Sequence, residues 1–411
     1  MQKRWLTALA VVAVLGLVAA ACGEDEGGST TTGATGATGA TAPVEQIDVT
    51  VYAQGAWTGP YNYLVVPGIQ AAQLHAKELS EDPTYPANIT IGTADTQGSG
   101  DQAPPVVQNV ISDPNTVAVV GPAFSGESLA SGDSYEQAGI PFVTQSATLP
   151  DLATQGWTYW YRTVAGDVLQ GGSDGRFLAE VVGSTKLFVV NDKEAYGKGL
   201  ADQVVIAATD SGAEIVGNEG VAPTDDYSAL ISDIESSGAD AVFYGGYDAD
   251  FAKIVKQGTD AGLSVSWMSG DGSVSSTYLD NAGPGVEGTY LSIASALGGD
   301  FVAKYNEAYG SEASAVPVYA AEGYDVMGLI GEGIKQAIEG GATTPEEIRA
   351  GIKAYLDTVT VDSPYQGVAK EIAFDENHDL TAADPLTLMF FYQVEDGQIT
   401  QLGDAATVLG G

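Results

Sequence analysis

The sequence predicts an α/β protein made of two successive doubly wound, three-layer lobes. From Ile47 onward, short β-branched runs alternate with segments of helical length, the pattern of a sheet covered by helices on both faces. The runs at 117–120 and 141–143 are apolar throughout, as expected of parallel strands buried on both faces. The pattern restarts at Lys186, and the roughly 365 residues after the first 45 suit two domains.

The expected elements fall into three groups along the chain. In the first group, strands and helices alternate at 47–53, 62–80, 88–94, 101–112, 116–121, 127–138 and 140–144. The second group repeats the alternation at 186–191, 197–211, 214–218, 227–237, 239–245, 248–261 and 264–268. The tail has helices at 299–309, 318–339 and 345–356, followed by strands at 386–394 and 398–402. The Asp-Gly pair between these two strands predicts a hairpin turn.

The first 45 residues predict an exported, lipid-anchored chain. Lys3 and Arg4 precede an apolar stretch and three alanines, the order of a secretory signal peptide over residues 1–21. The alternative, a membrane-spanning helix, needs about 20 apolar residues, more than this stretch offers. Cys22, the single cysteine, stands where bacterial signals that resemble lipoprotein signals carry the acylated cysteine. Residues 22–45, rich in Gly, Ala and Thr, then predict a flexible tether outside the cytoplasmic membrane, in the cell envelope.

Ligands of open α/β sheets bind in the crevice beyond the carboxyl ends of the strands. The loops at those ends are rich in Gly, Ser and Thr, which let a ligand approach the backbone and offer hydroxyl and amide donors. These crevice loops are Gly55 to Pro60, Pro122 to Gly126, Gln145 to Thr148, Tyr247 and Gly270 to Gly272.

Composition and motifs argue against nucleic-acid binding and against catalysis. Asp and Glu number 54 against 15 Lys and Arg, so no basic surface for nucleic acid is expected. His75 and His378, the two histidines, lie outside the crevice loops, and no nucleotide-binding or nucleophile-elbow motif occurs. The segment 375–379 resembles the start of a calcium loop, but Leu380 and Leu386 replace its Gly and Glu, which favours a solvated turn. We therefore expect no enzyme activity, no cofactor and no metal.

Four motifs follow one another along the crevice region. They are Val119-Val-Gly-Pro-Ala-Phe-Ser-Gly-Glu-Ser128, Ile140-Pro-Phe-Val-Thr-Gln-Ser-Ala-Thr148, Asn191-Asp-Lys-Glu-Ala-Tyr-Gly-Lys-Gly-Leu200 and Val242-Phe-Tyr-Gly-Gly-Tyr247. In this order and spacing they resemble the leucine/isoleucine/valine-binding proteins, substrate-binding subunits of branched-chain amino acid ABC importers. The resemblance extends over residues 46–404.

This resemblance implies a type I periplasmic-binding-protein fold, in which two lobes joined by three crossovers close over an amino acid. The crossovers are expected near Val164, Ser292 and Asp384. The two lobes would then comprise residues 46–164 plus 292–384 and residues 165–291 plus 385–411. The expected partners are an amino acid ligand and an ABC permease in the membrane, and the chain is expected to act as a monomer.

The resemblance also assigns residues to the two charged ends of the ligand. Ser125 and Thr148 map onto the positions that hold the ligand carboxylate, and helices are expected to start just after both. Asp271 maps onto the acidic position for the ligand ammonium, to which Ser146 would offer its backbone carbonyl. The alternative for Ser125 and Thr148 is helix N-capping, and for Asp271 it is a surface turn.

Other predicted ligand contacts are aromatic or lie within the same loops. Tyr196 and Tyr247 would close over the ligand from the second lobe, although a core position is the alternative for each. Tyr61 or Tyr63 would reach the pocket from the first lobe. The remaining predicted contacts are Ala147, in the carboxylate loop, and the side-chain walls Trp57, Phe124 and Tyr319.

The sequence therefore predicts a lipoprotein solute receptor that binds a zwitterionic amino acid, branched-chain or otherwise apolar, and delivers it to an ABC importer. One alternative is a receptor for small amides, urea-like compounds or aromatic acids. Another is a sensor domain that passes occupancy to a membrane kinase or receptor.

Overall fold

Two large sheets organise residues 45–410, the part of the chain that the computed structural model describes; the predicted signal peptide and Cys22 lie outside it. The first sheet is parallel, in the order β2-β1-β3-β4-β5. Its strands are β1 (Ile47–Gly55), β2 (Ala87–Asp95), β3 (Thr116–Val120), β4 (Phe142–Thr144) and β5 (Trp160–Arg162). We call this sheet with its helices lobe 1.

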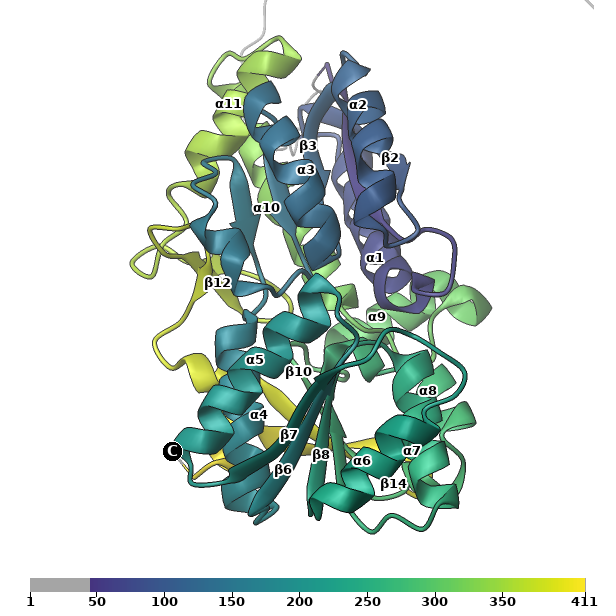
Figure 1. The fold of residues 1–411 in the computed structure, drawn as a ribbon. Helices are drawn as coiled ribbons and strands as arrows, with labels where there is room; N and C mark the ends of the chain where they lie inside the picture. The colour runs from purple at the N-terminus through teal and green to yellow at the C-terminus, as the bar shows by residue number, and fades with distance from the viewer. Residues whose placement is uncertain (1–44, 411) are drawn as a thin grey trace, which may run out of the picture. The chain divides into compact units, whose positions relative to one another are not determined.

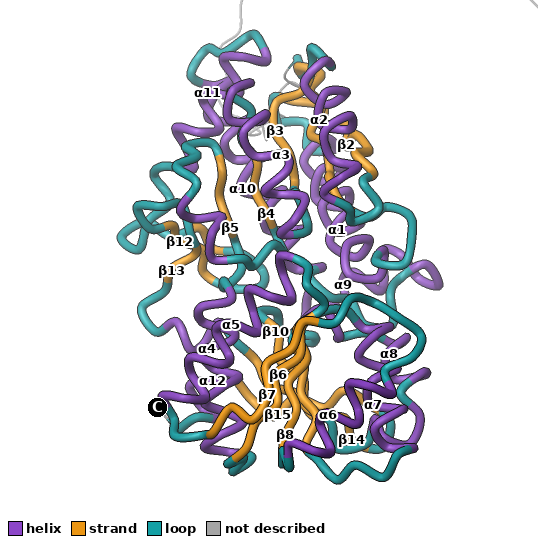
Figure 2. The backbone as a smooth tube through the Cα atoms, in the orientation of Figure 1, coloured by secondary structure: helices purple, strands orange, loops and turns teal. Residues whose placement is uncertain are grey.

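The second sheet has seven strands in the order β15-β14-β10-β9-β8-β6-β7, and we call it with its helices lobe 2. The last two strands along the chain run antiparallel and form the predicted hairpin, and the others are parallel. The strands are β6 (Lys186–Asn191), β7 (Glu214–Gly220), β8 (Ala241–Gly245), β9 (Ser266–Ser269), β10 (Tyr290–Ile293), β14 (Phe390–Glu395) and β15 (Gln398–Asp404). Figure 2 shows the strands of the two sheets as separate groups.

Strand order fixes which face each helix of lobe 1 covers. Because parallel crossovers are right-handed, the helix between β1 and β2 lies on one face, and those that follow β2 and β3 lie on the other. Of the helices in the tail, α10 packs against α1, and α11 packs against α10 (Figure 1). The helices are α1 (Asn62–Glu81), α2 (Ala103–Ser112), α3 (Ser125–Ala138), α9 (Asp300–Tyr309), α10 (Ala320–Glu339) and α11 (Pro345–Leu356).

The helices of lobe 2 follow the same rule. The crossover from β6 to β7 places its helix on one face, and the two following crossovers place theirs on the other. The helices are α4 (Asp167–Arg176), α5 (Ala195–Asp210), α6 (Ser228–Ser237), α7 (Asp248–Asp260), α8 (Ser276–Asn281) and α12 (Ala405–Val408).

A small third sheet contains β11 (Tyr365–Gln366), β12 (Glu371–Phe374) and β13 (Leu380–Thr381).

The chain passes between the two large sheets three times: after β5, after β10 and before β14. The predicted crossover positions fall in or beside these connections, and the predicted lobe boundaries stay a prediction. Among the described residues, no helix combines the length and apolar character needed to cross a membrane.

Two expected elements differ from the structure. The strand expected from Leu386 begins only at Phe390, because Asp384 caps a 3-10 turn over Pro385–Leu388. The helix expected after Thr148 is a short 3-10 turn, Pro150–Thr154.

Helix α4, which the sequence did not predict, packs closely on α5. Three of its ten residues are glycine, a poor helix former. A Cβ built on Gly175 would lie 2.6 Å from the backbone nitrogen of Ala208 and 2.7 Å from the carbonyl oxygen of Val204. Gly171 is similarly close to the backbone of Leu200, at 2.8 Å. Close approach of α4 and α5, rather than helix propensity, therefore explains Gly171 and Gly175.

Gly175→Ala should lower the free energy of unfolding by about 1–3 kcal/mol, because the methyl group would overlap the backbone of α5. Gly172→Ala, in the same helix, is the matched control. No atom lies within 4 Å of its built Cβ, so this variant should be neutral or more stable by up to about 1 kcal/mol. Urea denaturation of both variants measures the difference, and equal effects would contradict the close-packing explanation.

Candidate ligand-binding site

A small cavity lies between the lobes, near the carboxyl ends of strands in both sheets. The direction of winding reverses between β1 and β3 in lobe 1 and between β6 and β8 in lobe 2, and such switch points open crevices for ligands. The cavity has a volume of about 10 Å³, roughly the space of one water molecule. It is lined by Leu64, Ala123, Phe124, Ser125, Ser146, Tyr196, Tyr247 and Asp271.

Lobe 1 offers hydrogen-bond donors to this cavity. Helix α3 begins at Ser125, so the amides of its first turn lack partners within the helix and attract negative charge. The Ser125 hydroxyl is buried and accepts a hydrogen bond from the Leu149 amide at 3.3 Å. Thr148 is fully buried in the neighbouring loop and is not itself one of the lining residues; its hydroxyl lies beside the Asp167 carboxyl and forms no well-aligned hydrogen bond among the described residues. This combination can accommodate a carboxylate.

The N-capping alternative for Ser125 and Thr148 is wrong. Phe124 is the N-cap residue of α3, with extended backbone, and no side chain caps the helix. Ser125 is instead the first helical residue. The 3-10 turn that follows Thr148 starts after Leu149, which provides no side-chain cap either.

Lobe 2 contributes a buried carboxylate, Asp271, at the start of a 3-10 turn that follows β9. Its two oxygens accept hydrogen bonds from the phenol hydroxyls of Tyr196 at 2.7 Å and Tyr319 at 2.8 Å. The Tyr196 hydroxyl in turn accepts from the Gly272 amide at 3.1 Å. Burial raises the pKa of the Asp271 carboxyl above its ordinary value, and the two phenols oppose that rise. The surface-turn alternative for Asp271 is therefore wrong.

Tyrosines from lobe 1 contact lobe 2 around this carboxylate. Tyr319 precedes α10 and has a φ of 56°, which is unusual for a bulky residue, and it reaches across to Asp271. The Tyr63 hydroxyl donates to the carbonyl oxygen of Gly272. The Tyr61 ring lies 4.6 Å from the Tyr247 ring, measured between centroids. The two lobes are therefore in direct contact beside the cavity.

Aromatic rings form one wall of the cavity. The Phe124 and Tyr247 rings, one from each lobe, lie 6.0 Å apart with their planes at 61°. Tyr61 lies at the same distance from Phe124. Together with Leu64 these rings give the cavity an apolar side, opposite in character to the Ser125 and Asp271 sides.

Four predicted contacts, Trp57, Ala147, Thr148 and Tyr319, are not among the residues that line the cavity. The Trp57 indole donates to the carbonyl oxygen of Ala53, in the preceding strand β1, at 2.8 Å. Ala147 is buried in an apolar cluster, and its amide donates to the Thr144 hydroxyl. These four, like the predicted residues that do line the cavity, stay predictions as ligand contacts.

The sequence reasoning missed two residues that line the cavity, Leu64 and Ala123. Leu64 lies in the first turn of α1, directly after a predicted crevice loop. Ala123 lies within another crevice loop, beside Phe124. Position next to a crevice loop was thus the available signal, although neither side chain is polar.

Several acidic side chains near the site are buried. Burial raises the pKa of Glu127 to about 8 and the pKa values of Asp167 and Asp192 to about 7. Glu127 accepts a hydrogen bond from the Thr96 hydroxyl. Both carboxyl oxygens of Asp167 lack hydrogen-bond partners among the described residues. Within residues 45–410, no group of three or more acidic, His or Cys side chains is placed to hold a metal ion.

In the turn at 375–379, the first carboxylate binds the backbone amides of the turn itself. The Asp375 carboxylate accepts from the amides of Asn377 at 2.8 Å and Asp379 at 2.9 Å. His378 stacks on Tyr161, a residue of β5, and His75 stacks on Tyr324 of α10. Neither histidine is among the residues that line the cavity.

Comparison with known proteins places the chain in a family. A family model described as periplasmic binding protein matches residues 53–398, so the chain belongs to the periplasmic binding protein family. It is 29% identical over 293 residues to a leucine-, isoleucine-, valine-, threonine- and alanine-binding protein of Pseudomonas aeruginosa, covering 69% of this chain and 74% of that one. It is 30% identical over 267 residues to a Leu/Ile/Val-binding protein homologue of Brucella melitensis, covering 64% of this chain and 68% of that one.

Solved structures share the fold. A leucine-binding protein of Thermotoga maritima superposes with a TM-score of 0.74 at 23% identity, covering 86% of this chain and 97% of that one. A branched-chain amino acid transporter substrate-binding protein of Streptococcus pneumoniae, solved with isoleucine, gives 0.73 at 20% identity, covering 86% and 99%. These findings confirm the predicted fold and the predicted family.

Asp167→Asn should flatten the pH dependence of stability. With a folded pKa of about 7, Asp167 stays protonated between pH 4 and 7, whereas the unfolded chain releases the proton there. The unfolded state then binds fewer protons, so stability is lost as pH rises. Between pH 5 and 8 the variant should lose about 3 kcal/mol less unfolding free energy than the unmodified chain.

Urea denaturation at the two pH values measures this difference. The control is Asp233→Asn, which removes an exposed carboxyl and should leave the slope with pH nearly unchanged. Parallel pH profiles for the unmodified chain and Asp167→Asn would contradict the assignment.

Proposed function

We propose that this protein is an extracytoplasmic receptor that binds a zwitterionic amino acid with a branched-chain or other apolar side chain and delivers it to an ABC importer. The observation that carries the proposal is the cavity between the lobes, which has anion-binding donors on one side and the Asp271 carboxylate on the other. A zwitterion has this same separation of charges. The apolar wall of Leu64, Phe124 and Tyr247 suits an uncharged side chain.

In this proposal the ligand carboxylate binds the first-turn amides of α3 and the hydroxyls of Ser125 and Thr148. The ligand ammonium binds Asp271 in a charge-assisted hydrogen bond, with the backbone carbonyl of Ser146 as a second acceptor. Tyr196 and Tyr319 orient the Asp271 carboxylate. Relatives named for binding leucine, isoleucine and valine support the choice of side chain.

Closure of the lobes is the proposed switch. The contacts of Tyr63 and Tyr319 across the cavity hold the closed arrangement, and lobe closure around ligand is a common route to signal occupancy. A membrane permease would then recognise the closed form. We further propose that the protein acts as a monomer without enzyme activity or cofactor, and that its lobes comprise residues 46–164 plus 292–384 and 165–291 plus 385–411.

Asp271→Asn should abolish or reduce leucine binding by at least about 100-fold, because the ammonium loses its charged partner in a buried site. Isothermal titration calorimetry measures the affinity. The control is Asp280→Asn, an exposed residue of α8, which should bind as the unmodified chain does. Unchanged leucine affinity in Asp271→Asn would remove this residue from the site.

A thermal-shift screen of the purified protein tests the ligand class. Ligand bound only by the folded state raises the melting temperature by mass action. Apolar amino acids should give the largest shifts. Shifts with small amides, urea-like compounds or aromatic acids, and none with amino acids, would overturn the amino acid proposal in favour of those ligands.

We also propose that Cys22 is acylated after removal of residues 1–21. The support is the order of a basic start, an apolar stretch and small residues before the single cysteine. Two acyl chains anchor a protein stably, whereas one chain is marginal.

Cys22→Ser should release the protein from the membrane fraction into the soluble fraction, because no acyl chain can then be attached. Mass spectrometry of the mature N-terminus checks the processing directly. A mature protein that keeps an unmodified Cys22, or that retains residues 1–21, would contradict the anchor.

A further inference from the structure

Arg162 is the only Lys, Arg or His side chain that is buried within the described residues 45–410. It is 1% exposed and is the last residue of β5, at the first connection between the two sheets. A buried guanidinium is costly unless its donors are paired. Its partners therefore indicate what it does in the fold.

The guanidinium joins the Asp379 carboxylate to the loop that carries Thr148. Its Nε donates to Asp379 Oδ1 at 2.7 Å, and its Nη2 donates to Asp379 Oδ2. On the other side, Nη1 donates to the carbonyl oxygens of Leu149 at 2.9 Å and Ala147 at 3.4 Å. These two carbonyls belong to the residues on either side of Thr148.

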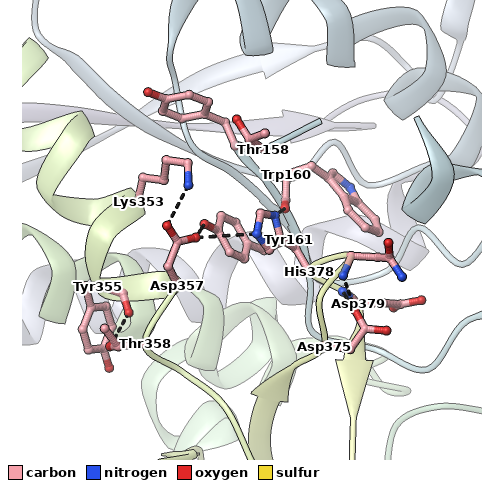
Figure 3. A network of polar contacts seen from close by, with 12 residues as sticks. Thr158, Trp160, Tyr161, Lys353, Tyr355, Asp357, Thr358, Asp375, His378 and Asp379 are labelled. Atoms are coloured by element: carbon pink, nitrogen blue, oxygen red, sulfur yellow. Dashed lines mark hydrogen bonds and ion pairs between the residues drawn. The ribbon is translucent and has the colours of Figure 1, made fainter. Parts of the chain in front are cut away.

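The acidic turn at 375–379 holds Asp379 in place against β5. The His378 ring stacks on Tyr161 at 4.4 Å, and its Nδ1 lies 3.1 Å from the carbonyl oxygen of Trp160. The Tyr161 hydroxyl donates to Asp357, which also pairs with Lys353 at 2.7 Å (Figure 3). The backbone amide of Arg162 donates to the carbonyl oxygen of His378. Residues 375–379, whose sequence resembles the start of a calcium loop, therefore hold β5 in place through these contacts.

The position of Thr148 depends on Arg162 and on the contacts that hold Arg162 in place. Its hydroxyl is buried beside the Asp167 carboxyl but forms no well-aligned hydrogen bond within residues 45–410, so its direction is set mainly by its backbone. That backbone is fixed by Arg162 on both sides and by the Asp167 amide, which donates to the Thr148 carbonyl oxygen at 2.8 Å. Arg162 itself is neutralised by Asp379 and touches neither Ser125 nor Asp271.

We propose that Arg162, held by Asp379, is a positioning residue that aims Thr148 at the ligand carboxylate. The inference rests on the proposed function, which places the carboxylate at Thr148. Lysine cannot reproduce the arrangement, because an ammonium lacks the planar fork that bonds a carboxylate and a carbonyl in fixed directions. In this proposal the planar geometry of the Arg162 guanidinium, rather than its charge alone, determines the affinity for leucine.

A double-mutant cycle on leucine affinity tests the proposal. Arg162→Lys and Thr148→Val should each weaken leucine binding about 10-fold, the loss expected for one hydrogen bond. The double variant should be no weaker than Thr148→Val alone, because Arg162 acts only through Thr148. A purely structural role would instead give additive losses. Isothermal titration calorimetry provides the affinities, and urea denaturation reports the stability of each variant.

Two further variants keep the test decisive. Asp379→Asn releases one end of the fork without changing the size of the side chain, and it should weaken leucine binding in the same non-additive way. It replaces Arg162→Lys if that variant does not fold. Arg176→Lys is the matched control, since Arg176 forms an exposed pair with Glu180 and should leave the affinity unchanged.

The outcomes separate this inference from the proposed function. If Thr148→Val weakens leucine binding but Arg162→Lys and Asp379→Asn do not, the result overturns only the positioning role of Arg162. Unchanged binding in Thr148→Val overturns the carboxylate position on which the inference rests. No leucine binding by the unmodified protein overturns the proposed function, and the inference with it.

Discussion

The burial of the Asp271 carboxylate is the constraint on which the site depends. A carboxylate removed from water needs hydrogen-bond donors, and no basic side chain in the described part of the chain is bonded to this one. The donors are two phenols, Tyr196 from the same lobe and Tyr319 from the other. The second of these bonds exists only while the lobes are together, so the carboxylate proposed to bind the ligand also links the lobes. In the proposed function, ligand recognition and lobe closure are therefore one physical event.

The chain carries 54 acidic against 15 basic residues, yet one side of its cavity suits an anion. It achieves this with uncharged donors: the first-turn amides of α3 and the hydroxyls of Ser125 and Thr148. Arg162, the one buried guanidinium within residues 45–410, contacts the loop through the carbonyl oxygens of Ala147 and Leu149 and is paired with Asp379. In the proposed function, selectivity for a zwitterion thus comes from fixed dipoles placed locally. The surrounding electrostatic field, which repels anions, then favours ligands without an extra negative charge.

Local patterns predicted most of the fold, and distant contacts account for what they missed. The continuous apolar run of β3 indicated a buried parallel strand, as the structure has it. Helix α4 escaped prediction because its glycines lower helix propensity, while the close packing that stabilises it involves α5, which lies later in the chain. At the site, the loop that carries Asp271 was predicted because it follows a strand, and the family resemblance singled out Asp271 within that loop. The contacts of Tyr63 with Gly272 and of Arg162 with Asp379 span 209 and 217 residues, and no local pattern records them.

Residues 45–410 contain no cysteine, so neither lobe is stapled by a covalent bond between side chains. The fold described above rests on packing and hydrogen bonds alone, and its stability does not depend on the redox potential of its surroundings. This has a practical side. One cysteine introduced into each lobe could be labelled without background from the folded body, and a pair of spin labels or fluorophores would read the separation of the lobes directly in solution.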